Sequence, residues 1–147
     1  MDFSQAKKLL EQGIPFVQRS GIEILELRRG FVRLRLPYAP NVNHIGTVYA
    51  GALFTGAELP GGALFLSSFD VSRYFPIVRS MNIEFLKPAK ADVFVEVSLD
   101  EARITAIQAE ADAAGKADFE LEARLLDAEG TLLARSLGKY QLRRTGA

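Results

Sequence analysis

The sequence predicts an α+β fold in which a meandering sheet surrounds one buried helix. The main observation is a run from Val48 to about Phe69 that is apolar on nearly every face. Segments that alternate apolar and polar residues, as half-buried strands do, lie before and after this run. Because an apolar helix needs a layer that covers it, we expect the strands to form a sheet around it.

A short helix is predicted at the start of the chain. Ser4 is a candidate N-cap, and the helix is expected to run to about Gln12. Gly13 and Pro15 then end it, because glycine favours the position after a helix and proline cannot continue one.

A β-hairpin is predicted next, from two alternating segments at 22–29 and 31–38 that are joined around Gly30. In the second segment the valine and leucines face one side and the two arginines face the other, as in a strand with one face buried.

The long apolar helix follows a loop marked by Asn41, Asn43 and Gly46, and Thr47 is its expected N-cap. Pro60 lies inside the helix. It lacks an N–H group and crowds the carbonyl four residues earlier, so we expect a kink or a break there. The alternative is that the LPGG segment forms a turn between two shorter helices.

The second half of the chain predicts more strands and one further helix. This helix opens at Asp100 and stops at Gly115. A turn is expected at 127–130. The alternating segments lie at 78–88, 91–99, 117–130 and 131–144.

Composition sets limits on function. The 147 residues predict one domain spanning 1–147. With 18 basic and 18 acidic residues, no overall charge recruits nucleic acid or an anionic membrane. There is no cysteine and one histidine, His44, so we expect no metal site within one chain. The first residues do not resemble a signal peptide and no apolar run has transmembrane length, which predicts a cytoplasmic protein.

The segment NHIGTVYAGALFTGAE resembles the phenylacetyl-CoA thioesterase-like branch of the hotdog-fold acyl-CoA thioesterases. The motif of that branch is N-x-x-G-T-x-H-G-G-A-x-x-x-x-x-D. The longer string APNVNHIGTVYAGAL also resembles less characterised thioesterase-like families. The resemblance implies a hotdog fold, an antiparallel sheet wrapped around one long buried helix, from about Gly21 to the end. The matching positions are Asn43, Gly46, Thr47, Gly51 and Glu58.

Three positions depart from the motif. Tyr49 stands where many relatives have histidine, and Ala50 stands where they have the first glycine. Val78 stands where some relatives have a serine that orients water. Ser80 is two residues further along, and we expect it on the same face of the strand as Val78. These changes concern the catalytic groups and not the scaffold.

The N-terminus of the long helix is the candidate oxyanion site. Its free N–H groups and positive dipole end can hold a carbonyl oxygen as negative charge develops on it. The expected donors are the N–H groups of Ala50 and Gly51, where small side chains let a substrate approach. The alternative is that these small residues only allow close packing of the helix on the sheet.

Glu58 is the candidate general base or nucleophile. It follows Tyr49 by about 13 Å of helix and points to the opposite side, so it cannot serve a substrate at its own helix N-terminus. A second copy, packed with its helix antiparallel, can supply it, as the resemblance implies for sites at a dimer interface. Burial is expected to raise the pKa of its carboxyl. The alternative is a solvated or paired structural acid beside the Pro60 kink.

The other site residues are predicted around these two. Asn43 can bind the attacking water or the thioester carbonyl, or can instead shape the loop as an Asx turn. His44 is expected to stabilise the loop, and Tyr49 to fill the space of the missing histidine. The expected substrate contacts are Gly46, Tyr49, Phe54, Val78 and Ser80. Candidate acyl-pocket or core residues are Leu53, Phe54, Phe65, Phe69, Phe85, Val95 and Leu125, and candidate partners for a coenzyme A tail are Arg79, Lys87, Lys90 and Arg143.

Two functions are compatible with these residues. The first is hydrolysis of an acyl-CoA or acyl-carrier thioester by water, with coenzyme A as part of the substrate and no other cofactor. The second is a hotdog module that binds acyl or aryl thioesters without hydrolysing them. A dehydratase ranks last, because His44 is poorly placed to pair with an acid. The open sheet edge and helix face predict a homodimer, which can pair again into a tetramer.

Overall fold

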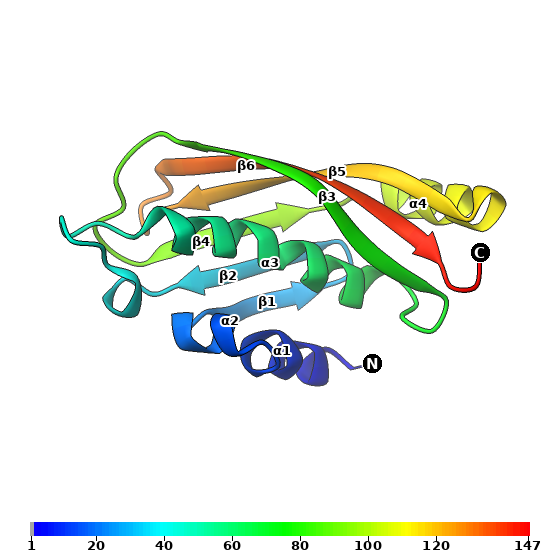
Figure 1. Ribbon diagram of the computed structural model, residues 1–147, viewed down its shortest axis with the longest axis horizontal. Coiled ribbons are helices and arrows are strands. Elements are labelled where there is room, and N and C mark those ends of the chain that lie inside the picture. The colour runs from blue at the N-terminus through cyan, green and yellow to red at the C-terminus, as the bar shows by residue number, and fades with distance from the viewer. Residues whose placement is uncertain (1) are drawn as a thin grey trace.

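One long helix, α3 (Ala50–Ser68), lies against the concave side of a six-stranded sheet in the computed structural model, which describes residues 2–147 (Figure 1). The strand order is β1-β2-β4-β5-β6-β3, and every neighbouring pair is antiparallel. The predicted arrangement of a sheet around an apolar helix is confirmed. The strands are β1 (Glu23–Arg28), β2 (Phe31–Leu36), β3 (Tyr74–Phe85), β4 (Val93–Ser98), β5 (Lys116–Leu126) and β6 (Leu132–Arg144).

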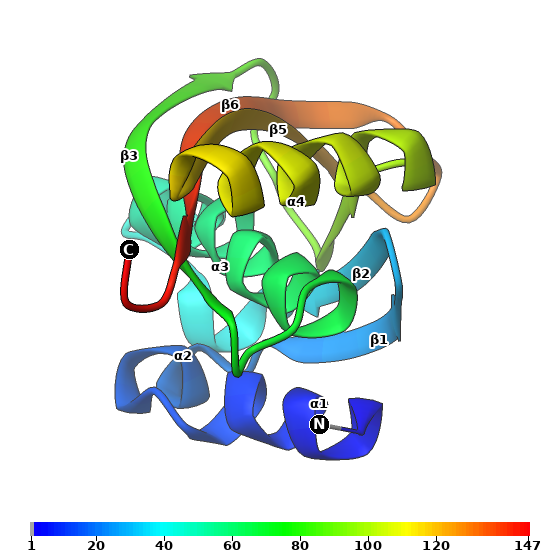
Figure 2. The ribbon, with the colours of Figure 1, turned by 90° about the vertical axis from the view of Figure 1, so that its right-hand side faces the viewer.

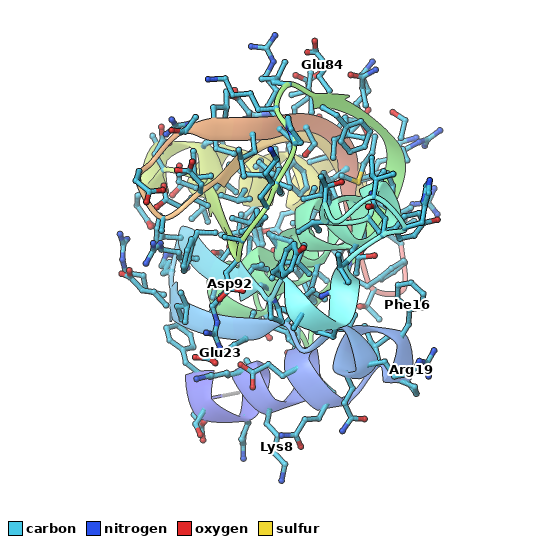
Figure 3. All side chains as sticks on the ribbon, turned by 90° about the vertical axis from the view of Figure 1, so that its left-hand side faces the viewer. Lys8, Phe16, Arg19, Glu23, Glu84 and Asp92 are labelled. Carbon is cyan, nitrogen blue, oxygen red and sulfur yellow. The ribbon has the colours of Figure 1, made fainter. Side chains whose placement is uncertain are left out.

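Three further α-helices surround this unit within residues 2–147, and a short 3-10 helix, η1 (Ala39–Asn41), lies between β2 and α3. The helices α1 (Phe3–Gln12) and α2 (Pro15–Ser20) lie on the side of β1, and α1 also packs on α3. Lys8 and Arg19 of these helices point away from the body (Figure 3). The helix α4 (Glu101–Ala114) packs against β5 and β6, and its buried residues belong to the same hydrophobic core as α3 (Figure 2).

The start of the chain differs from prediction in two ways. The N-cap of α1 is Asp2, whose side chain accepts a hydrogen bond of 2.8 Å from the N–H of Gln5, and Ser4 lies inside the helix. Gly13 ends α1 as predicted. Pro15, however, opens α2, because the first position of a helix has no need of an N–H group.

The long helix begins later than predicted and does not break. Its N-cap is Tyr49, without a side-chain cap, and the hydroxyl of Thr47 is bonded to Asn43 instead. The helix continues through Pro60, so the alternative of two helices joined by a turn is wrong. Leu59, Pro60 and Gly61 are buried, and this packing offsets the cost of about 3 kcal/mol expected for an internal proline.

The predicted strands and the second-half helix are confirmed, with shifted boundaries. Gly30, in the β1–β2 turn, has a φ of 78°. Asp100 caps α4 through the N–H of Arg103, and Gly115 ends it. The strand β3 begins at Tyr74, before the predicted segment, and includes Pro76. Within residues 2–147, β3 pairs only with β6, and an edge strand tolerates proline.

A β-bulge reverses the faces of β3 at Arg79. Val78 lies opposite Tyr140 of β6, whereas Ser80 lies opposite Lys139, and the register shifts between them. Tyr140 is buried towards α3 and Lys139 is exposed on the outer face. Val78 therefore faces α3 and Ser80 faces outward, so the expectation that these two residues share a face is wrong. A bulge inserts one extra residue, which sequence alternation does not reveal.

One side of α3 is left uncovered by this chain, contrary to the prediction of burial on all sides. Of the predicted pocket residues, Phe54 is 41% exposed and Phe85 on β3 is 52% exposed. Phe65 is half-buried, and the other four are buried. The uncovered stripe of α3 consists of Gly51, Phe54, Thr55, Glu58, Gly62 and Phe65. It runs beside the edge strand β3.

Candidate functional site

A cavity of about 260 Å³ opens at the N-terminus of α3. The loop before α3 contributes Asn43 and Thr47 to its lining, and α3 contributes Ala50 and Leu53. The remaining wall is the segment 85–89 at the end of β3. Three segments therefore meet here, and two of the predicted site residues, Asn43 and Ala50, lie together.

The loop is held in place by hydrogen bonds at both of its ends. At its start, the N–H of Tyr38 donates to the carboxylate of Asp92 at 2.8 Å (Asp92 is labelled in Figure 3), and the Tyr38 hydroxyl donates to the Gly46 carbonyl at 2.7 Å. At its end, the N–H of Val48 donates to the carbonyl of Ala89 at 2.9 Å. The helix N-terminus is thereby fixed relative to the cavity wall.

Asn43 shapes this loop and keeps one donor free. Its side-chain oxygen accepts hydrogen bonds from the N–H groups of Ile45 and Thr47, both at 3.0 Å. Its amide nitrogen donates to the Thr47 hydroxyl at 2.8 Å. An amide nitrogen has two N–H bonds, and the second has no acceptor among residues 2–147. The Asx-turn alternative is therefore observed, and it leaves a donor beside the cavity.

The first turn of α3 presents two unpaired N–H groups. Those of Ala52 and Leu53 donate to the Tyr49 carbonyl, at 3.0 and 3.1 Å. Those of Ala50 and Gly51 have no acceptor among the described residues. Unpaired N–H groups at a helix N-terminus are suited to an oxyanion, because the helix dipole adds to their partial positive charge.

Tyr49 lies over this end of the helix instead of filling a gap. Its side chain is 60% exposed, and a Cβ added at Gly51 would lie only 2.5 Å from the Tyr49 ring carbon Cε2. Glycine at position 51 thus leaves room for the ring. A ring in this position limits access to the N–H groups from one side.

Glu58 lies away from this cavity. It follows Ala50 by about 12 Å of helix. Its side chain is half-buried, and burial raises the pKa of its carboxyl. Among residues 2–147 the carboxylate has neither a hydrogen bond nor an ion pair, so the paired form of the structural alternative has no support within one chain. The solvated form is compatible with the half-buried side chain.

A tyrosine that the sequence analysis missed lies next to Glu58. Tyr140 of β6 is 5% exposed, and burial and the nearby charge of Glu58 raise the pKa of its phenol to about 12. The strand sequence carries a usable signal, because Gly138 precedes Tyr140 by two residues and therefore lies on the same face. Aromatic residues often cover such a glycine in sheets.

The other residues predicted near the site lie in three different parts of the structure. Gly46 and His44 lie exposed in the loop, and Val78 is 44% exposed beside the uncovered stripe. Ser80 lies on the outer face of the sheet.

Of the four basic candidates, Lys87 lines the cavity. Arg79 lies at the bulge, Arg143 is bonded to Gln141 on the outer face, and Lys90 is not part of the lining. No cluster of three or more potential ligands within residues 2–147 is arranged to hold a metal ion. No helix in the same range is long and apolar enough to cross a membrane.

A sequence model for a domain of unknown function, DUF4442, matches residues 4–140. The chain belongs to the DUF4442 family. No curated protein matches this DUF4442 sequence significantly.

Comparison with solved structures identifies the fold. A Pseudomonas aeruginosa protein of unknown function, PA5026, described as a probable thioesterase, is 52% identical, with a TM-score of 0.95. The match covers 98% of this chain and 97% of that one. The fold is that of the hotdog thioesterase-like superfamily, as the sequence motif predicted.

More distant structures share the fold alone. The P. aeruginosa thioesterase PA1618, solved as a mutant, is 16% identical with a TM-score of 0.74, and the match covers 98% of this chain and 95% of that one. The Escherichia coli PaaI protein, from the phenylacetic acid degradation operon, is 16% identical with a TM-score of 0.65. That match covers 94% of this chain and 93% of the other.

Proposed function

We propose that this protein hydrolyses acyl thioesters of coenzyme A at the cavity beside the N-terminus of α3. The observation that carries the proposal is the pair of unpaired N–H groups, on Ala50 and Gly51, at a cavity also lined by Asn43. Thioester hydrolysis needs such donors, since the carbonyl oxygen becomes negatively charged in the transition state. The likeness to PA5026, described as a probable thioesterase, supports the same chemistry.

The reaction follows from these groups. The thioester carbonyl oxygen accepts hydrogen bonds from the two N–H groups, and the free donor of Asn43 holds the attacking water. A carboxylate, Glu58, takes a proton from the water as its oxygen bonds to the carbonyl carbon. The tetrahedral intermediate then collapses, the carbon–sulfur bond breaks, and the proton passes to the departing thiolate. The products are a carboxylic acid and a free thiol.

Glu58 is supplied by a second copy of the chain. It lies about 12 Å along the helix from Ala50, too far to reach a substrate at its own helix N-terminus. Two copies with their α3 helices antiparallel bring each Glu58 to the other cavity. The uncovered stripe of α3 and the unpaired edge of β3 offer the surfaces for such a homodimer.

Lys87 favours coenzyme A as the carrier. Its ammonium has no ion-pair partner in residues 2–147 and stands at the cavity wall, where it can meet a phosphate of the substrate. We expect Lys87→Ala to raise KM for acyl-CoA about tenfold with kcat unchanged. The acyl N-acetylcysteamine thioester, which has no phosphate, should be hydrolysed equally by both proteins. Lys139→Ala, on the outer face, is the matched control. An equal rise in KM for acyl-CoA in both lysine variants would contradict the assignment of Lys87 to the phosphate.

A non-catalytic module that binds thioesters is the second candidate. The observations that favour it are the Tyr49 ring over Gly51 and the use of the Asn43 side chain within its own loop. The ring limits access to the N–H groups at the helix N-terminus, and the loop hydrogen bonds occupy much of the Asn43 side chain. Both groups are needed for catalysis.

Thiol release separates the two candidates. The assay uses a chromogenic thiol reagent and a panel of aryl-, short- and medium-chain acyl-CoAs. The chain contains no cysteine and contributes no background. Hydrolysis of any member supports a thioesterase, and the best substrate identifies the acyl class. Absence of turnover across the panel, with melting temperatures that rise on ligand addition, would favour the binding module.

A further inference from the structure

Tyr140 carries a buried phenol that the mechanism above does not use. Its ring stacks on Phe119 of β5 with the centroids 5.7 Å apart, so β5 and β6 together fix its plane. The side chain is 5% exposed and faces α3. No hydrogen bond of its hydroxyl is formed within residues 2–147. The hydroxyl oxygen itself is not fully enclosed, so it remains open to a hydrogen-bond partner.

Two glycines hold the phenol end of the ring against α3. A Cβ added at Gly61 of α3 would lie 2.5 Å from ring carbon Cε1 and 2.9 Å from the hydroxyl oxygen of Tyr140. A Cβ added at Gly138 of β6 would lie 3.1 Å from the same oxygen. Neither position accepts a side chain while the ring stays where it is. The hydroxyl therefore lies between α3 and β6.

Glu58 is the neighbour of this hydroxyl on the helix. It precedes Gly61 by three residues, a spacing that puts two residues side by side on a helix surface, about 5–6 Å apart. Its carboxylate has no partner within residues 2–147, so its side chain is free to rotate towards the phenol. The charge of Glu58 contributes to the raised pKa of Tyr140, which agrees with this proximity.

Several titratable groups on the elements around α3 have partners of their own or lie at the edge of the sheet. Lys7 and Glu11 of α1 lie 3.9 Å apart as an ion pair. Tyr74 of β3 donates to Asp112 of α4. Arg79 lies in the bulge at the sheet edge. The inner face of β6 carries two hydroxyls without a partner within residues 2–147, those of Ser136 and Tyr140, and Tyr140 is the one that lies against Gly61 of α3.

We propose that Tyr140 is a positioning residue for Glu58, to whose carboxylate its phenol donates a hydrogen bond. The catalytic part of this inference rests on the function proposed above. The bond has two effects: it fixes the direction of the carboxylate, and it stabilises the ionised form that a base needs. Burial of Glu58 favours the neutral form, and the phenol opposes that tendency. Because its own pKa is about 12, Tyr140 keeps its proton while Glu58 exchanges one.

The test is Tyr140→Phe, which keeps the ring, its stacking on Phe119 and its fit between the glycines. Without the donor the pKa of Glu58 should rise by about one unit. A base must be ionised, so activity is lost as pH falls through this pKa. The acid limb of the plot of kcat/KM against pH should therefore shift to higher pH by about one unit. Activity should be about tenfold lower than that of the wild type at pH values below the limb, and close to it at pH values well above. Tyr74→Phe, which removes a buried phenol bonded elsewhere, should leave the limb in place.

A second readout does not depend on activity. The Glu58 carboxyl carbon can be followed by carbon-13 NMR in protein labelled with glutamate, assigned by its absence from Glu58→Gln. A pKa that rises by about one unit in Tyr140→Phe and not in Tyr74→Phe supports the positioning role, even for a protein without thioesterase activity. An unchanged Glu58 pKa in Tyr140→Phe overturns the proposal, whatever the enzyme assay shows. A uniform loss of activity at every pH, with no shift of the limb, overturns it as well.

Discussion

Glu58→Gln is expected to lower kcat for thioester hydrolysis by about 10²- to 10⁴-fold, the usual contribution of a general base. Glutamine has nearly the same shape as glutamate but cannot take a proton from water. The side-chain oxygen of glutamine can still accept the hydrogen bond proposed from Tyr140, so the change leaves no partner unsatisfied. Because a neutral amide is easier to bury than a carboxylate, the melting temperature should be equal to or above that of the wild type.

The control for this variant is Glu122→Gln, which removes an exposed carboxylate on the outer side of β5. It should hydrolyse the best substrate of the panel at the wild-type rate. Saturation kinetics and a thermal melt measure both variants. If Glu58→Gln keeps at least a third of wild-type kcat, Glu58 is not the base and the mechanism is wrong at its central step.

Ala50→Pro is expected to lower kcat by about 10²- to 10³-fold without weakening the fold. Position 50 is the first of α3, where proline fits well, and Tyr49 before it has φ −58° and ψ 135°, a conformation that precedes proline readily. The Ala50 N–H has no acceptor among the described residues, so no structural hydrogen bond is lost. What proline removes is one donor to the developing oxyanion, and such donors contribute about this much to kcat.

Ala50→Ser keeps the N–H group and is the matched control, with near wild-type kcat expected. Mixing inactive Ala50→Pro with inactive Glu58→Gln then tests whether the site is shared between subunits. Random exchange makes half of the dimers mixed, and each mixed dimer has one intact site of two. Activity should recover to about a quarter of wild type. No recovery after demonstrated subunit exchange would place both residues in one subunit's site.

The fold was predictable because its main signals are local. A run of apolar residues on every face identifies α3, and Gly30, Asp100 and Gly115 mark turns and helix ends through their own backbone preferences. The errors have non-local causes. Pro60 stays inside α3 because surrounding packing holds the helix together, and the bulge at Arg79 depends on how β3 pairs with β6.

The part of the candidate site that comes from neighbouring residues of the chain was predictable as well. Asn43, Ala50 and Gly51 lie close together in the chain, so a loop and one helix turn bring them to one place. The separation of Glu58 from them follows from helix geometry alone. Tyr140 comes from a distant strand, and only the packing of β6 on α3 brings it near Glu58. No pattern around Glu58 contains that information.

The fit of the Tyr140 ring also constrains how this family can diverge. Gly61 and Gly138 come from separate elements, yet each has room for no more than hydrogen while a tyrosine occupies position 140. A mutation to alanine at either glycine requires the aromatic ring to shift or to be replaced by something smaller. Lineages that keep the tyrosine should therefore keep both glycines, and lineages that lose it are free to change them. The three positions are expected to evolve as one unit, although they are scattered along the gene.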